Sequence, residues 1–223
     1  MRRSARATSL PPELGAAQIG AGAERLGVAL DAAQLGQLAA YARLLVHWNT
    51  THNLTAIRGG EEMLTHHLLD SLALVPHLAR ATHGGAARVL DVGSGGGLPG
   101  IVLAVALPQA RLTLVDAVQK KCAFLTQARL ELRLSNVEVV HARIEAMSGP
   151  LHEVVVSRAL ASLAQFVGWT RHLLVPGGCW LAMKGRLPAD ELAALPADVQ
   201  ATVVPIAVPG LDEERHLIEM RTR

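Results

Sequence analysis

Aromatic residues are scarce in this chain of 223 residues: they make up 3% of it, as one Tyr, two Phe and three Trp. A platform of aromatic rings on which single-stranded bases could stack is therefore not evident. Cysteine is scarcer still, with Cys122 and Cys179 alone. Two cysteines so far apart exclude a disulfide framework, and we expect buried free thiols in a reducing compartment.

Long apolar runs and a strong net charge are also missing. No apolar run approaches the length that spans a bilayer. The basic stretch at residues 1–6 is followed by Pro11, Pro12 and Glu13 rather than by the apolar stretch of a secretory signal. We therefore expect a cytoplasmic protein without a membrane partner, although an organellar transit peptide stays open. The formal net charge of +2 does not by itself argue for nucleic acid.

The order of apolar patterns predicts two parts. Residues 1–84 form a helical extension, with helices expected at 32–48, which Asp31 caps, and at 61–78. Residues 85–223 alternate between strand-like and helix-like runs and form one compact α/β domain. Strands are expected at 88–92, 111–115, 137–141, 153–156 and 179–183, and helices at 98–107, 119–133 and 160–174.

This alternation predicts a doubly wound, mostly parallel sheet with helices on both faces, as in a Rossmann-like fold. The last strand-like runs, 199–208 and 216–221, have no helix between them. They predict an antiparallel C-terminal hairpin at one edge. With no long exposed apolar helix or unpaired strand in the pattern, we expect a monomer.

The most informative segment is VLDVGSGGGLPG at residues 89–100. Its strand-like start leads into five glycines within residues 93–100, and a helix-like run follows. Glycine lets a backbone approach a ligand closely, and a helix N-terminus offers free N–H groups, so the layout predicts a nucleotide cradle. Asp116 ends the next predicted strand, where a carboxylate can accept hydrogen bonds from both hydroxyls of a ribose.

Two ligand classes compete for this cradle. Residues 95–100 satisfy G-x-G-x-x-G, and Asp116 lies 21 residues after Gly95, which favours a dinucleotide-dependent oxidoreductase. However, Asp91 would repel a pyrophosphate, and Pro99 removes an N–H group that a phosphate would use. A ligand with an adenine, a ribose and a positively charged group fits better, and S-adenosylmethionine is such a ligand.

Motifs outside the turn are more specific. The chain resembles the RsmG (GidB) family of methyltransferases, which modify N7 of a guanine in 16S ribosomal RNA, from about residue 35 to residue 186. The motifs keep the family's order and spacing. They are Trp48-Asn49, Asn53-Leu54-Thr55-Ala56-Ile57, His67-Leu68-Leu69-Asp70-Ser71-Leu72, residues 91–100, Val115-Asp116-Ala117, Lys120-Lys121, Phe124-Leu125, Arg143-Ile144-Glu145, Ser157-Arg158-Ala159 and Met183-Lys184-Gly185.

The resemblance implies a class I S-adenosylmethionine-dependent methyltransferase fold with an N-terminal helical extension. It also implies that small-subunit ribosomal RNA is the substrate, within the small subunit or an assembly intermediate. A non-catalytic RNA-binding or ribosome-binding module with the same fold is a further alternative. The expected cofactor-binding residues, from the resemblance and from their places after the strands, are Gly93, Gly95, Leu98, Asp116, Ile144, Glu145 and Arg158.

The basic residues at strand ends are candidates for RNA phosphate contacts. These RNA-binding candidates are Arg143, Lys184 and Arg186, with Asn53 added from the helical part. For His66 or His67 with Asp70, three or four residues on, we expect a structural hydrogen bond along one helix face rather than a metal site. No catalytic residue is assigned, because N7 of guanine carries no proton and its methylation needs placement rather than a base.

Overall fold

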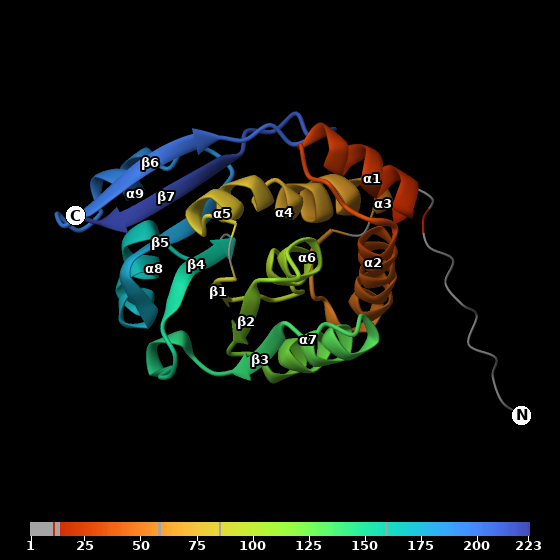
Figure 1. The fold of residues 1–223 in the computed structure, drawn as a ribbon, viewed down its shortest axis with the longest axis horizontal. Helices are drawn as coiled ribbons and strands as arrows, with labels where there is room; N and C mark the ends of the chain where they lie inside the picture. Colours follow the sequence, from red (N-terminus) through yellow and green to blue (C-terminus); the bar gives the residue numbers. More distant parts are fainter. Residues whose placement is uncertain (1–10, 12–13, 58, 85, 159) are drawn as a thin grey trace, which may run out of the picture.

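The computed structural model describes residue 11 and residues 14–57, 59–84, 86–158 and 160–223. Within these ranges the strands form one seven-stranded sheet, in the order β3-β2-β1-β4-β5-β7-β6 (Figure 1). The strands are β1 (Arg88–Val92), β2 (Arg111–Asp116), β3 (Val137–His141), β4 (His152–Arg158), β5 (Leu174–Lys184), β6 (Val199–Pro205) and β7 (His216–Thr222). Strands β1 to β5 are parallel, while β7 runs antiparallel to both of its neighbours. The expected mostly parallel sheet with an antiparallel C-terminal strand is confirmed.

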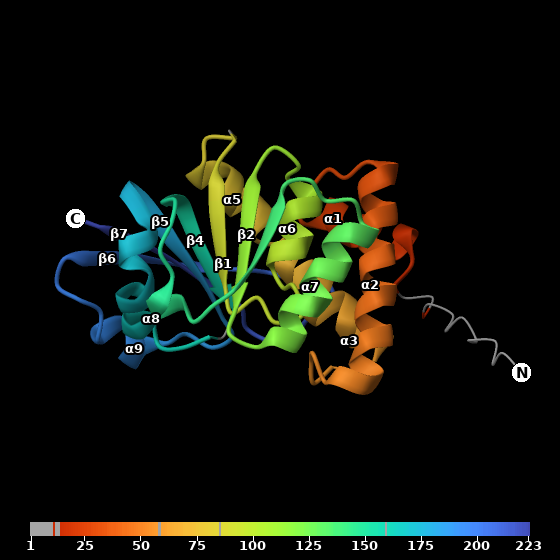
Figure 2. The same ribbon diagram turned by 90° about the horizontal axis from the view of Figure 1, so that it is seen from below.

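Helices cover both faces of the sheet (Figure 2). They are α1 (Ala16–Arg25), α2 (Ala32–His52), α3 (Gly60–Met63), α4 (Asp70–Leu72), α5 (Val75–Ala81), α6 (Gly100–Ala106), α7 (Gln119–Glu131), α8 (Leu163–Thr170) and α9 (Ala189–Ala193). A π-helical turn lies at Leu64–Leu69, and 3-10 turns lie at Ile144–Ala146 and Arg171–Leu173. Successive residues of β4 alternate between the two cores: Val154 and Val156 belong to one buried cluster and Val155 to the other. A strand buried on both faces needs such a continuous apolar run.

The N-terminal helices pack on the same core as α6 and α7. Buried side chains of α1, α2, α4 and α5 join those of the sheet in one cluster. Helix α2 is also tied by hydrogen bonds from Gln34 to the carbonyl of Val105 and from Gln37 to the carbonyl of Leu132, at 2.9 and 2.8 Å. Further along α2, the buried hydroxyl of Tyr41 donates to the carbonyl of Gly96 in the glycine turn. The helical extension therefore supports the turn directly.

Some element boundaries differ from those expected, and capping explains several. Asp31 caps α2 as predicted, in a reciprocal capping box with Gln34. The helix expected at 160–174 is wrong at both ends: it begins at Leu163, because Ser162 forms a capping box with Gln165, and it ends at Thr170. The helix expected at 61–78 is broken by the π-helical turn. The C-terminal strands pair as expected, but β7 is inserted between β5 and β6, so the edge strand is β6.

Candidate functional site

The glycine turn follows β1 and is held by hydrogen bonds to the end of β2 and within the turn itself. The N–H groups of Gly93 and Ser94 both donate to the carbonyl of Val115, at 2.9 and 3.1 Å. Gly97 and Leu98 donate to the carbonyl of Ser94. Gly93 has a φ of 69°, a left-handed conformation that side-chain-bearing residues rarely adopt. Since these N–H groups are already used, few donors remain for a pyrophosphate.

Asp116 joins this turn to the end of β2. Its buried carboxylate accepts hydrogen bonds from the N–H groups of Gly95 and Val118, each at 2.9 Å. The ammonium of Lys121 lies 3.6 Å from the same carboxylate. Each carboxylate oxygen has a second lone pair, so both can still accept a hydrogen bond from a ligand hydroxyl.

A pocket of about 260 Å³ opens beside the turn, and we call it the turn pocket. Strand ends, the 3-10 turn and α8 contribute its walls. Its lining residues are Val92, Gly93, Val115, Asp116, Ala117, Lys121, Ala142, Arg143, Ile144, Glu145, Leu160 and Trp169. The pocket combines an apolar lining with one buried carboxylate, which is suited to an adenosine-like ligand.

Asp91 lies behind the turn and is completely buried. One carboxylate oxygen accepts the N–H of Gly100 at 3.0 Å, while the other has no hydrogen-bond partner among the described residues. A Cβ at Gly100 would lie 2.5 Å from this carboxylate, so the close approach requires glycine. Burial raises the pKa of the Asp91 carboxyl to about 7. A buried carboxylate with an unused oxygen is suited to a cationic ligand.

Asp91 gives the protein a testable pH dependence. The carboxyl ionises near pH 3.8 in the unfolded chain but near 7 in the folded one, so between these values the unfolded state binds fewer protons. The free energy of unfolding contributed by this group therefore falls as pH rises from about 4 to about 7, by at most about 1.4 kcal/mol per pH unit. We expect Asp91→Asn to lack this component. Urea denaturation between about pH 4 and about pH 7 measures the free energy of unfolding of both proteins. If that free energy had the same pH dependence in the wild type and in Asp91→Asn, the assignment would be contradicted.

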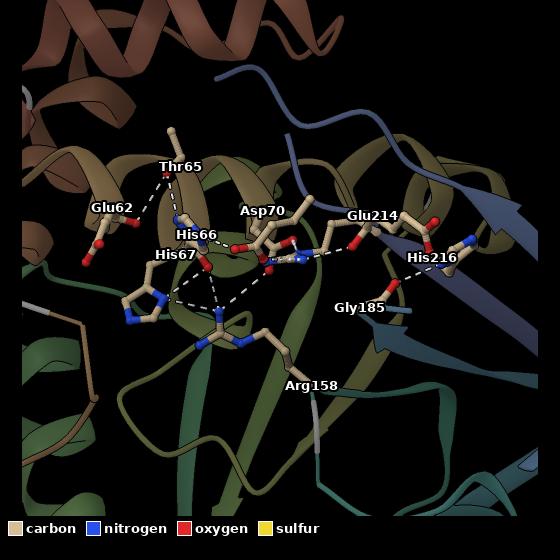
Figure 3. A network of polar contacts seen from close by, with 11 residues as sticks. Glu62, Thr65, His66, His67, Asp70, Arg158, Gly185, Glu214 and His216 are labelled. Atoms are coloured by element: carbon tan, nitrogen blue, oxygen red, sulfur yellow. Dashed lines mark hydrogen bonds and ion pairs between the residues drawn. The ribbon is translucent and has the colours of Figure 1, made fainter. Parts of the chain in front are cut away.

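A second pocket of about 410 Å³ lies at the ends of β4 and β5, and we call it the arginine pocket. It is lined by Thr55, Ala56, Ile57, His66, His67, Asp70, Arg158, Met183, Lys184, Gly185 and Arg215. Its centre is Arg158, whose Nη1 donates to the carbonyl of His66 at 2.8 Å and lies 3.2 Å from Nδ1 of His67 (Figure 3). The same nitrogen is 3.6 Å from the buried carboxylate of Asp70.

The expected His–Asp hydrogen bond is wrong. Arg158 stands between His67 and Asp70 and contacts both (Figure 3), while the other ring nitrogen of His67 lies 2.6 Å from the hydroxyl of Thr55. The reason is the π-helical turn, whose wider winding removes the α-helical placement of His67 and Asp70, together with the guanidinium of Arg158 that lies between them. Burial, and then the charge of Arg158, lower the pKa of His67 to about 4, so this histidine is neutral at pH 7.

The structure distributes the expected cofactor-binding residues over both pockets. Gly93, Asp116, Ile144 and Glu145 line the turn pocket, whereas Arg158 lines the arginine pocket. The other two expected residues, Gly95 and Leu98, line neither pocket. The N–H of Gly95 donates to the carboxylate of Asp116, and Leu98 is buried in the turn.

The expected RNA-binding residues do not form one group. Arg143 lines the turn pocket, and Lys184 lines the arginine pocket, where its ammonium donates to Glu191 at 2.8 Å and to the carbonyl of Ala161. Arg186 is exposed after β5, and Asn53 is exposed at the C-terminal end of α2. Sequence reasoning missed Leu160, Trp169 and Arg215 as lining residues.

No group of three or more metal-ligating side chains comes together in the part of the chain that the structure describes. Among the same residues, none of the helices has both the length and the apolarity to cross a membrane.

Comparison with known proteins reveals close relatives. The ribosomal RNA small subunit methyltransferase G of Acidovorax ebreus (strain TPSY) is 53% identical over 209 residues, covering 90% of this chain and 92% of that protein. The protein of the same name from Burkholderia mallei (strain NCTC 10229) is 52% identical over 205 residues, covering 89% of this chain and 88% of the relative.

A solved methyltransferase from Thiobacillus denitrificans, in complex with S-adenosyl-L-homocysteine, superposes with a TM-score of 0.52. It is 15% identical, with 67% of this chain and 90% of that one covered, and so supports the fold alone. The model of the GidB family, described as rRNA small subunit methyltransferase G, matches residues 34–218. These matches decide against the oxidoreductase interpretation: the chain belongs to the GidB family, the rRNA small subunit methyltransferases G.

Proposed function

We propose that this protein transfers the methyl group of S-adenosylmethionine to N7 of a guanine in 16S ribosomal RNA. The observation that carries the proposal is a pair of pockets at the carboxyl ends of the parallel strands, one beside the glycine turn and one around Arg158. In open α/β sheets ligands bind at this edge. The turn pocket suits the adenosyl part of the donor, and the arginine pocket suits an anionic nucleic-acid acceptor beside it. The names of the close relatives agree with small-subunit ribosomal RNA as the substrate.

The residues present fit the donor. The free lone pairs of Asp116 can accept the ribose hydroxyls, and Ile144 with Glu145 provides one apolar and one acidic group for the adenine end. Asp91 is buried behind the turn and lines neither pocket, so its ionised carboxylate would favour a positively charged ligand group only through the turn. When bound, S-adenosylmethionine supplies an electrophilic methyl group on a sulfonium.

The contribution of the protein to the reaction is placement. N7 of guanine is already a nucleophile without a proton, so no general base is required. His67, which is neutral and hydrogen-bonded to Thr55, and the Arg158–Asp70 ion pair give the acceptor side a fixed wall.

The test is to map the modified nucleotide. Small ribosomal subunits lacking the modification, treated with the protein and labelled donor, are expected to gain one N7-methylguanine, which mass spectrometry of digested RNA locates. Label at another atom or base would overturn the N7 assignment. No label at all, with the donor bound normally, would favour the non-catalytic module instead.

We further propose that the substrate is a folded particle, an assembled small subunit or an assembly intermediate, and that the protein acts as a cytoplasmic monomer. The scarcity of aromatic residues supports recognition by shape and phosphate rather than by base stacking. Initial rates on particles are expected to exceed those on short RNA oligomers at least tenfold. Equal initial rates on particles and on short RNA oligomers would contradict the particle substrate. Light scattering measures the molar mass in solution and so tests whether the protein is a monomer.

A further inference from the structure

One buried carboxylate in the arginine pocket is shared by two arginines. Asp70, on α4, lies 3.6 Å from Nη1 of Arg158 and 3.4 Å from Nε of Arg215. Its side chain is 6% exposed, against 24% for Arg158 and 17% for Arg215. The carboxylate offsets the repulsion between two guanidinium groups that would otherwise be costly to hold together.

The two arginines come from distant parts of the chain. Arg158 ends β4, whereas Arg215 lies directly before β7, on the segment that returns from β6. The backbone around Arg215 is fixed on both sides: its carbonyl accepts the N–H of Ile206 at 2.8 Å, and the ring of the next residue, His216, lies 2.8 Å from the carbonyl of Gly185 (Figure 3). A long side chain on a fixed backbone loses less freedom when it binds a ligand.

Both guanidinium groups keep unused donors. Arg158 makes its hydrogen bonds through Nη1. The hydrogen bond and ion pairs of Arg215 use Nε and Nη1, the latter to Glu213 and to the carbonyl of Glu214. Among the described residues, Nη2 of each arginine has no hydrogen-bond partner. Glu213 is 63% exposed, so its ion pair with Arg215 is screened by solvent and is readily exchanged.

The charge of the pocket favours an anion. Its lining carries three cations, Arg158, Lys184 and Arg215, and a single carboxylate, Asp70. Planar guanidinium groups with paired N–H donors are the side chains best matched to phosphate oxygens. Because both pockets lie at the carboxyl ends of the parallel strands, an anion bound here would lie at the same edge of the sheet as the proposed donor site.

We propose that the arginine pocket binds a backbone phosphate of the RNA next to the target guanine, with Arg215 as a positioning residue that contacts it. This inference rests on the proposed function for its choice of RNA as the source of the phosphate. It gives the C-terminal hairpin a role in substrate binding that the motifs of residues 35–186 do not include.

The experiment compares Arg215→Gln with Arg221→Gln, a matched control on β7 whose exposed arginine bonds the carbonyl of Gly177 far along the strand. RNA dissociation constants are measured across salt concentrations, and donor binding by calorimetry. Arg215→Gln is expected to weaken RNA binding about tenfold and to reduce the slope of log K against log salt by about 0.7 to 0.9, the contribution of one phosphate contact. Donor affinity should stay unchanged, and Arg221→Gln should match the wild type in every measurement.

Arg215→Lys is a second test in case Arg215→Gln does not fold, because it keeps a cation beside Asp70. It is expected to retain the salt slope and to bind RNA about threefold more weakly, since an ammonium cannot form the forked contact. Wild-type RNA affinity in both folded variants would overturn the phosphate site while leaving N7 methylation intact. If the wild type binds RNA with the expected slope but transfers no methyl group, the proposed function fails and the phosphate site stands.

Discussion

Gly93→Val is expected to lower the affinity for S-adenosylmethionine at least about 100-fold, or by about 2.7 kcal/mol. Gly93 has a φ of 69°, and a Cβ built there lies 2.5 Å from a methyl group of Leu160, which lines the turn pocket. The added side chain therefore fills the pocket itself or pushes Leu160 into it. Calorimetry with the donor and thermal shift with S-adenosylhomocysteine measure the loss.

The control for this substitution is Gly27→Val. Gly27 has the same φ of 69°, but nothing lies within 4 Å of the position of its Cβ. Both variants carry the cost of a left-handed valine, of the order of 1–2 kcal/mol, but only one obstructs the pocket. Gly27→Val should lose stability and keep its donor affinity. Equal donor affinities in the two variants would remove the turn from the binding site.

Asp116→Asn is expected to weaken donor binding about 30-fold and to lower the free energy of unfolding by about 1–3 kcal/mol. The carboxylate accepts from two backbone N–H groups, those of Gly95 and Val118. The amide of asparagine has one oxygen, so one buried N–H group loses its acceptor, and the ribose hydroxyls lose the charge that would hold them.

Asp198→Asn is the matched control, because Asp198 is exposed and paired with Arg171, and neither residue lines the turn pocket. It should bind the donor like the wild type. If Asp116→Asn also binds the donor normally but melts earlier, Asp116 only holds the turn. A loss of affinity without a loss of stability would show that it contacts the ligand and that the turn is held by its other hydrogen bonds.

The alternating part of the chain was the easier one to predict. Strands β1 and β3 have the boundaries expected. The central strand β1 is buried over most of its length and shows as a short apolar run, whereas the edge strand β3 is partly exposed and is marked by its β-branched residues. The helix that includes Asp70 was harder. Its apolar spacing indicates one α-helix, but tertiary contacts stabilise a π-helical turn at Leu64–Leu69, and the carbonyl of His66 accepts a hydrogen bond from Arg158 there.

The residues of the candidate site also differ in how well the sequence predicts them. Gly93 was predictable because it lies in the glycine motif that follows a strand, and Asp116 because it ends the next strand. Trp169 was not, since its ring reaches the turn pocket from α8 and no motif marks it. Lys184 was correctly expected at a strand end, but its ion pair with Glu191 depends on the placement of the short helix α9, which the sequence did not indicate.

The sequence by itself determined the sheet, the glycine turn with its two acids, and the family, because these depend on local periodicity and on short motifs of fixed spacing. Only the tertiary structure decided that Arg158 lines a pocket distinct from the turn pocket and that Asp70 is shared with Arg215. Asp70 and Arg215 are 145 positions apart in the sequence, and a contact at such a distance is set by how β7 enters the sheet between β5 and β6. No local pattern encodes that insertion, since it results from packing free energy summed over the whole sheet.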